Sequence, residues 1–435
     1  MQKKMFLALL VLGCAVLCGS QAFADTVKIV NPWAVEAESN GVRAVFDVPV
    51  PNICEATDQT ASIPPFRFNK SGWQQGYALK GVKAIECSVT DAVDPASVQV
   101  KSVKNGKIYL ADKDYKINNW GCIGTLEGGS LINADTPFAI SYRYAKMRID
   151  SIVRNAEGSL AYLAGEPHAV NPAQPQISAD QKRIANIWIP GRISELNDDL
   201  IFLIQPKGNK AKSPKKDPVA KTLVPKTWKK LIEGKEVRIL AWGDSVTAGN
   251  FLPQKDKWQF QFADRLQKLF PNAKITLISE AWGGRNSDSY RREPKGSPKN
   301  YEEKVLAVKP DLIVSEFVND SGMSIDRVQI RYGEMLKDFQ KNGMEWIICS
   351  PHYVRPDWMK FTGNKNLDQD PRPYVAGIRK FAKENGVALA DASLLYGQLW
   401  REGIPYHTLM VNSINHPNAF GMKLFADALM ELFGE

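Results

Sequence analysis

A serine, a histidine and two amide donors in this chain have the types and placement that acyl transfer requires. Ser245 follows an apolar run at residues 237–242 and the dipeptide Gly243-Asp244, and residues 246–248 suit the start of a helix. A serine at such a junction lies at the C-terminal edge of a sheet, where open α/β folds bind ligands, and near helix N–H groups that stabilise negative charge. The alternative is an ordinary strand-to-helix turn in which Asp244 and Ser245 only cap the helix.

Three later segments supply the other groups that a serine nucleophile needs. Residues 275–279 are typical of a strand, and the glycine pair that ends in Gly284 follows it. A further expected strand begins at residue 312 and ends in Asn319, whose amide can donate a hydrogen bond. His416 stands in a loop before the last expected helix. Nucleophile, oxyanion donors and base, each at the end of a different element, match the demands of acyl transfer.

Four short motifs resemble the conserved blocks of the GDSL or SGNH hydrolases, and they occur in that family's order. They are Gly243-Asp244-Ser245, Gly284, Val318-Asn319-Asp320 and His416-Pro417. The resemblance implies that Ser245 is the nucleophile and His416 the general base. It also implies an oxyanion hole formed by the N–H groups of Ser245 and Gly284 with the Asn319 amide. No metal ion is expected, because the sequence has no close Cys/His spacing of the zinc type, and no cofactor is expected either.

Two positions depart from the family pattern. Phe317 replaces the glycine usual two residues before the asparagine, and Ser413 replaces the aspartate usual three residues before the histidine. Neither Ser413 nor the adjacent Asn412 can stabilise an imidazolium as a carboxylate would. A Ser–His dyad assisted by a backbone carbonyl of the 412–415 loop is the preferred expectation, and the Ser413 hydroxyl is a possible third member that could orient the ring without charge.

Two alternatives to this dyad stay open, namely a carboxylate from another segment or weak catalysis. Asp391 and Asp357 are the candidate carboxylates, since each follows an expected strand and so should lie at the catalytic edge. The loop at residues 351–359 follows such a strand too, and it offers His352, Arg355 and Trp358 as substrate contacts.

Residues 1–24 have the features of a secretory signal: two lysines, an apolar run and a small-residue cleavage site. We therefore expect export to the periplasm or the medium, with lipid attachment at Cys14 as a less favoured alternative. No other segment has the roughly 18 apolar residues of a spanning helix.

Export permits a disulfide among Cys54, Cys87 and Cys122, whereas Cys349 lies in an apolar run typical of a core.

The rest of the chain divides by texture into three parts. Residues 25–205 contain short alternating runs separated by turn residues, which predicts an all-β, sandwich-like accessory domain. Residues 206–236 are rich in lysine and proline and are expected to be a linker. Residues 237–435 alternate expected strands and helices, which predicts a three-layer, flavodoxin-like domain with a parallel sheet.

The linker lysines account for most of the formal net charge of +9, so the basic balance is local. A solvated spacer explains them better than binding to nucleic acid or acidic polymers. In the β-rich part, Trp33, Trp73, Tyr77 and Trp120 could stack on sugars, although such residues more often belong to a core. The combined expectation is a secreted esterase that removes O-acetyl groups from a polysaccharide. The alternatives are a lipid or aryl esterase, and a glycan-binding protein with a degenerate hydrolase domain.

Overall fold

The computed structural model of this chain describes residues 25–128, 137–204, 217–359, 370–402 and 404–435. The expected signal segment at 1–24, with Cys14, lies outside the described residues, as do residues 205–216 of the expected linker. Within the described part, no helix is both long and apolar enough to span a membrane.

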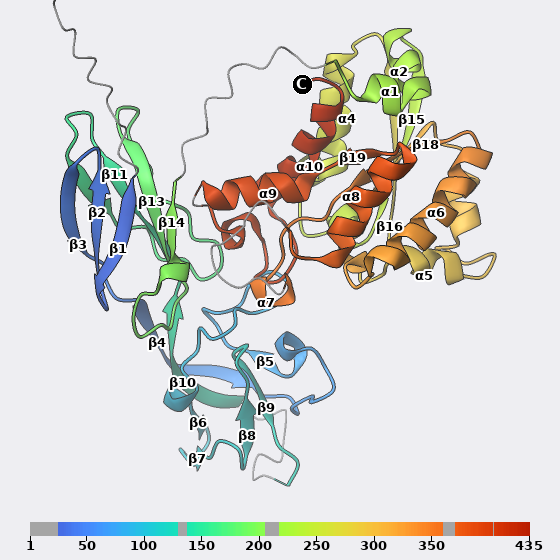
Figure 1. Ribbon diagram of the computed structural model, residues 1–435. Coiled ribbons are helices and arrows are strands. Elements are labelled where there is room, and N and C mark those ends of the chain that lie inside the picture. Colours follow the sequence, from blue (N-terminus) through green and yellow to red (C-terminus); the bar gives the residue numbers. More distant parts are fainter. Residues whose placement is uncertain (1–24, 129–136, 205–216, 360–369, 403) are drawn as a thin grey trace, which may run out of the picture.

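The N-terminal region is built from antiparallel strands, as predicted (Figure 1). They form four sheets with the orders β1-β2-β3, β4-β10-β6-β7, β12-β11-β13-β14 and β5-β9-β8. The strands are β1 (Thr26–Asn31), β2 (Ala34–Ser39), β3 (Val42–Asp47), β4 (Asn52–Ser62), β5 (Tyr77–Ala78), β6 (Gln99–Ser102), β7 (Ile108–Tyr109), β8 (Tyr115–Ile117), β9 (Cys122–Thr125), β10 (Pro137–Lys146), β11 (Arg148–Arg154), β12 (Leu160–Leu163), β13 (Lys182–Ile189) and β14 (Ile201–Leu203).

The alternating sequence pattern of this region produces its buried faces. In β10, Phe138, Ile140 and Tyr142 are buried because side chains two apart lie on the same side of a strand. Trp120 is buried too, and Trp73 packs against the same core. The aromatic residues of the region are therefore largely core residues.

The C-terminal region contains a five-stranded parallel sheet with the order β16-β15-β17-β18-β19. Its strands are β15 (Glu236–Gly243), β16 (Lys274–Ala281), β17 (Leu312–Glu316), β18 (Glu345–Cys349) and β19 (Ala388–Ala390). The chain starts the sheet at β15, adds β16 on one side of it and then adds β17, β18 and β19 on the other side, as in flavodoxin-like folds. The predicted fold of this region is confirmed, and the carboxyl end of β15 lies at the switch point where such folds bind ligands.

Helices cover both faces of this sheet (Figure 1). Side chains of β15 alternate between two cores: Val237 and Ile239 join the one containing α4 and α10, and Leu240 and Trp242 join the one containing α6 and α8. The helices are α1 (Ala220–Leu223), α2 (Pro225–Ile232), α3 (Ser245–Ala248), α4 (Trp258–Leu269), α5 (Ser287–Arg292), α6 (Ile325–Lys341), α7 (Pro356–Met359), α8 (Pro373–Asn385), α9 (Ala392–Arg401) and α10 (Ala419–Leu432).

One local expectation differs from the structure. The expected linker contains α1 and α2, because Pro225 occupies the first turn of α2, where a helix needs no N–H donor. Trp228 of α2 packs edge-on against Phe270, so this helix is part of the C-terminal region (hereafter the hydrolase-like region). The last helix begins at Ala419, with Asn418 as its cap, directly after the loop that carries His416.

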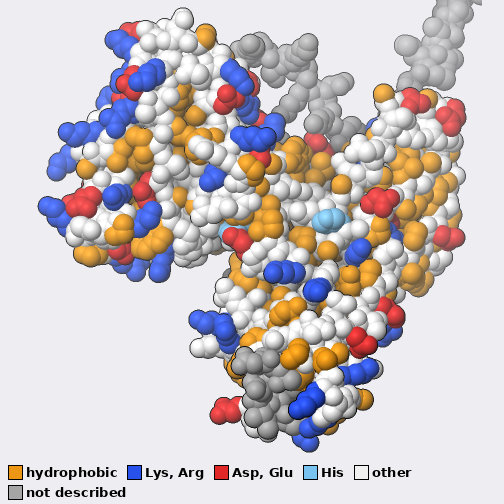
Figure 2. Space-filling model, turned by 180° about the vertical axis from the view of Figure 1, so that it is seen from behind, with side chains coloured by type: hydrophobic (Ala, Val, Ile, Leu, Met, Phe, Trp, Pro, Cys, Tyr) orange, Lys and Arg blue, Asp and Glu red, His pale blue; other side chains and the backbone are white. Residues whose placement is uncertain are grey.

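Cys54, Cys87, Cys122 and Cys349 are all present as thiols, so none of the disulfides that export would permit is formed among them. Cys349 is buried in the core, as expected. Figure 2 shows basic and acidic side chains interspersed over one face of the molecule.

Candidate active site

Ser245 begins α3 directly after β15, in a turn that tolerates only a glycine at position 243. A Cβ atom on Gly243 would lie 2.1 Å from Thr247 Oγ1 and 2.3 Å from the Glu316 carbonyl oxygen. Asp244 caps α3: its Oδ1 accepts the Val246 N–H at 3.0 Å. Asp244 therefore caps the helix, and this capping leaves the Ser245 hydroxyl available as a nucleophile.

Three buried carboxyl groups lie beneath this turn. Asp244 Oδ2 accepts the backbone N–H of Asn319 at 2.8 Å, which links the serine turn to the end of β17. Asp320 accepts the Ser287 N–H at 3.1 Å and the Tyr332 hydroxyl at 3.0 Å. Burial raises the pKa of Asp244 to about 7 and that of Asp320 to about 6. Burial also raises the pKa of Glu316, and the charge of Asp244 adds to that increase.

The two expected oxyanion donors flank the serine turn. Arg285 N–H bonds the Trp282 carbonyl at 3.2 Å, and Gly284, with a φ of +72°, occupies the position in this turn that favours glycine. A Cβ atom on Gly283 would lie 3.7 Å from Ser245 Cβ, so this turn adjoins the serine. Asn319 donates one amide hydrogen to the Arg285 carbonyl at 3.2 Å, which holds its side chain against the same turn.

Phe317, which replaces the usual glycine, points away from the reacting groups. Its ring is buried and packs edge-on against Trp242, with centroids 4.8 Å apart. It also lies 6.2 Å from the Tyr290 ring. Phe317 therefore adds a ring to the core. The backbone of Asn319 is held in place by its hydrogen bond to Asp244.

His416 meets Ser245 through one ring nitrogen: Nε2 lies 3.0 Å from Ser245 Oγ. The histidine loop is fixed by Asn412, whose Oδ1 accepts the N–H groups of Ile414, Asn415 and His416 at 3.1, 2.9 and 2.9 Å. Phe251 stacks on the imidazole with centroids 4.5 Å apart and planes 10° apart. The ring is thus held in position to accept the serine proton.

The other ring nitrogen, Nδ1, meets the carboxylate of Glu86, a residue of the N-terminal region. Burial lowers the pKa of His416, and the negative charge of Glu86 opposes that decrease. Sequence reasoning missed Glu86. The nearest signal was indirect, because the neutral Ser413 implied that any carboxylate must come from another segment.

The expectations for the third member of the site were wrong in two respects. A carboxylate reaches His416, so the carbonyl-assisted dyad is not what forms. Asp391 instead pairs with Arg379, at 2.8 Å, and accepts the Ser350 hydroxyl at 2.7 Å. It follows β19, which is separated from β15 by β17 and β18, at roughly 4.8 Å per strand. Asp357 belongs to α7, and its side chain lies outside the described part of the structure.

The three expected substrate contacts have different surroundings. His352 is fully buried and donates its Nε2–H to the Asn415 carbonyl at 2.6 Å, so the expectation that it contacts substrate was wrong. Burial and the nearby Arg372 lower the pKa of His352 to about 3, which keeps it neutral. The Arg355 guanidinium lies 4.7 Å from the Trp120 ring. Trp358 is 48% exposed and lines a small cavity beside Asn319.

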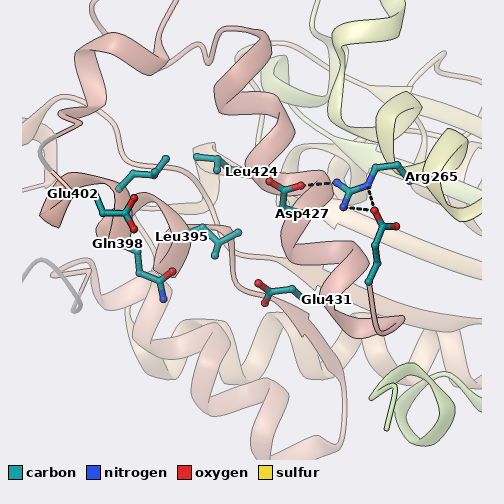
Figure 3. Close-up of a pocket in the computed structure, with 9 residues that line it drawn as sticks. Arg265, Leu395, Gln398, Glu402, Leu424, Asp427 and Glu431 are labelled. Atoms are coloured by element: carbon teal, nitrogen blue, oxygen red, sulfur yellow. Dashed lines mark hydrogen bonds and ion pairs between the residues drawn. The ribbon is translucent and has the colours of Figure 1, made fainter. Parts of the chain in front are cut away.

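That cavity, of about 90 Å³, lies between the expected oxyanion donor and the histidine loop. It is lined by Val318, Asn319, Ser321, Val354, Trp358, Arg372 and Asn415. A larger hollow of about 320 Å³ between α4, α9 and α10 holds ion pairs from Arg265 to Asp427 and Glu435 (Figure 3). Its lining includes none of the expected reactive residues. Among the described residues, no group of three potential metal ligands converges.

Comparison with known proteins identifies the C-terminal region. Residues 241–424 match the GDSL-like lipase/acylhydrolase family, and this part of the chain belongs to that family. No curated protein matches the chain.

Several solved structures match about half of the chain. One is a two-domain esterase active on acetylated mannans, with 18% identity over 49% of this chain and 52% of that one, and a TM-score of 0.39. Another is a variant of an acetyl xylan esterase from Geobacillus stearothermophilus, with 17% identity over 46% and 95% of the chains and a TM-score of 0.36. A third is the acetyl xylan esterase AlAXEase, with 24% identity over 45% and 98% and a TM-score of 0.35. The chain thus spans about half the length of the first.

Proposed function

We propose that this chain is a serine ester hydrolase that works through an acyl-enzyme. The observation that carries the proposal is the 3.0 Å contact between Ser245 Oγ and His416 Nε2, within the region that matches the acylhydrolase family. A hydroxyl within hydrogen-bond reach of a restrained imidazole is the arrangement that activates a serine nucleophile.

The proposed reaction uses these groups in two half-reactions. Ser245 Oγ attacks the ester carbonyl carbon while His416 Nε2 takes the hydroxyl proton. The resulting oxyanion is bound by the N–H groups of Ser245 and Gly284 and by the Asn319 amide. Collapse breaks the bond to the alcohol oxygen, which receives the proton from His416. Water then attacks the acyl-enzyme by the same route and releases the acid and Ser245.

The proposed acyl group is acetyl or a similarly short chain. The support is the cavity of about 90 Å³ beside Asn319, which is well below the roughly 300 Å³ at which pockets for larger ligands begin. Val318 and Val354 make part of its lining apolar, which suits a methyl group.

The proposed alcohol is a sugar hydroxyl of a polysaccharide outside the cell. Support comes from the exposed Trp358 ring beside the cavity, with the Trp73 ring 6.4 Å away. Flat apolar faces with a polar edge offer stacking area to a sugar ring. Export, which the first 24 residues favour, would bring the protein to such polymers.

Two measurements test this proposal. Ser245→Ala should abolish hydrolysis of a chromogenic acetate ester and labelling by a fluorophosphonate probe, both of which the wild-type protein should show. Undiminished hydrolysis in that variant would exclude the mechanism. Acetate release from a panel of acetylated glycans should exceed hydrolysis of long-chain esters, and the opposite preference would identify a lipid esterase.

A further inference from the structure

We infer that Glu86, supplied by the N-terminal β-rich region, is the carboxylate that orients His416 and stabilises its charged form, and that Ser413 helps to hold it there. The inference rests on the proposed esterase function and deepens it. It makes the N-terminal region part of the active site rather than an appended module.

The two contacts of the imidazole define the protonation state that a general base needs. A carboxylate oxygen only accepts hydrogen bonds, so the contact of Glu86 with Nδ1 requires a proton on Nδ1. Nε2, which lies 3.0 Å from Ser245 Oγ, then carries the lone pair that can accept the serine proton. When Nε2 gains that proton, Glu86 is the carboxylate in contact with the imidazolium.

The backbone at Glu86 is unusual for a glutamate. Residues 85 and 86 form a tight turn, closed by the bond from the Ala84 N–H to the Cys87 carbonyl at 2.9 Å and by pairing of Lys83 with Ser88. Glu86 has a φ of +65°, a left-handed conformation that turns normally assign to glycine or asparagine. The turn itself therefore does not favour glutamate, whereas its carboxylate has a defined partner in His416.

Ser413 holds this turn against the histidine loop. Its hydroxyl donates to the Ser88 carbonyl oxygen at 3.0 Å, and Cys87 Sγ lies 3.8 Å from the same hydroxyl. The residue at the family's aspartate position thus contacts the segment that carries Glu86. Ser413 is three residues from His416, so a single loop positions both the base and its carboxylate.

A second set of contacts between the two regions lies on the adjoining loop. The Arg355 guanidinium lies over the Trp120 ring at 4.7 Å, and the Trp73 and Trp358 rings are 6.4 Å apart. Arg355 also contacts the histidine loop, because its backbone N–H donates to the Ile414 carbonyl oxygen at 3.0 Å. The N-terminal region therefore contacts the C-terminal region at a second place besides the Glu86 turn.

A surface ion pair without effect on catalysis is the competing hypothesis. The Glu86 side chain is 44% exposed, and exposed pairs often contribute little to stability. The two hypotheses differ in what Glu86→Gln does. A mere surface pair would leave turnover intact, whereas a carboxylate that stabilises the imidazolium in the transition state would be needed for kcat.

The decisive experiment compares Glu86→Gln, Glu86→Asp and the control Glu55→Gln in the full chain. Glu55 is an exposed residue of β4 in the same region. With a short chromogenic acetate, we expect Glu86→Gln to lower kcat about 10²-fold with little change in KM, near the lower end of the acid–base range because Glu86 is partly exposed. Glu86→Asp should recover part of the loss, and Glu55→Gln should match wild type. Wild-type kcat in Glu86→Gln would overturn the inference.

A second readout does not depend on any substrate. NMR titration of the His416 ring, assigned by loss of its signal in His416→Gln, should give a lower pKa in Glu86→Gln than in wild type. An unchanged pKa would overturn the inference even if the enzyme is active. If neither Ser245 labelling nor ester hydrolysis is found in the wild type, the proposed function fails, while this titration still decides whether Glu86 controls the ring.

Discussion

The Ser413 hydroxyl donates a 3.0 Å hydrogen bond to the carbonyl oxygen of Ser88, two residues beyond the glutamate that meets His416. The sequence position where the family has an aspartate therefore has a different task in this chain. A hydroxyl can donate to a carbonyl oxygen, and a carboxylate cannot. A serine at this position can therefore make the contact to the Glu86 turn that an aspartate could not make.

Ser413→Ala should lower kcat through Glu86, by about tenfold, which corresponds to ~1.4 kcal/mol. The variant removes one hydrogen bond that anchors the turn but leaves both the base and the carboxylate in the chain. In a Glu86→Gln background the same change should have almost no further effect, because the group that it positions is already neutral. Turnover numbers of the four proteins test this, and strictly additive losses would contradict the coupling.

Ser413→Asp should lower activity in the wild-type background and raise it in Glu86→Gln. In the wild-type background, the new carboxylate at position 413 is placed near Glu86 and faces the Ser88 carbonyl oxygen. The repulsion disfavours the charged forms of both carboxylates. In the second case the new carboxylate stands where the family has its own. Steady-state rates of the single and double variants check this, and a rise in the wild-type background would mean that His416 lacks an effective carboxylate.

Asp391→Ala should affect stability more than catalysis. Its carboxylate pairs with Arg379 and caps α9, so its loss should cost about 1–2 kcal/mol of unfolding free energy. Turnover should change by less than about tenfold. Urea denaturation and rate measurements on the same sample check both parts. A loss of several orders of magnitude in kcat would instead return Asp391 to the catalytic site.

Much of the site could be predicted because its residues follow the strands of a parallel sheet. Ser245 follows β15, Gly284 follows β16 and Asn319 follows β17, three strands adjacent in the sheet. Carboxyl ends of parallel strands meet at one edge, so sequence order was enough to bring these residues together.

The remainder depends on contacts that no periodic pattern encodes. Glu86 and His416 are 330 positions apart, and a tight turn in a β-rich region carries no signal for the loop that it will meet. His352 follows a strand at the same edge, yet it is fully buried and hydrogen-bonded to the histidine loop. Asp391 also follows a strand, but β19 is the edge strand and is too distant from β15.

Asn319→Ala should reduce kcat about 10²–10³-fold, the usual cost of removing one oxyanion donor. The fold around it should persist, because the bond that holds this segment to Asp244 comes from the backbone N–H and not from the amide. Ser321→Ala, in the lining of the same cavity, is the matched control. Equal and small effects of both changes on kcat would exclude Asn319 from the oxyanion hole.

The kcat/KM of the wild type should rise with pH, with its midpoint below the pKa of an ordinary histidine. His416 must be neutral to accept a proton, and burial lowers its pKa from the ordinary 6.5 while Glu86 opposes this. Buried His352, with a pKa of about 3, stays neutral over this range. Asp244, with a pKa of about 7, is the other nearby titrating group.

Glu86→Gln separates these two titrating groups in the pH profile. Without the negative charge of Glu86, burial alone acts on His416, so its pKa falls further and its limb of the profile should move to lower pH. A limb due to Asp244 should stay in place, because burial is the first cause of its shift and Glu86 is not among the causes. Rates of both proteins with a short chromogenic acetate, measured from acidic to neutral pH, check this prediction. A profile unchanged by the substitution would show that His416 is not the group observed.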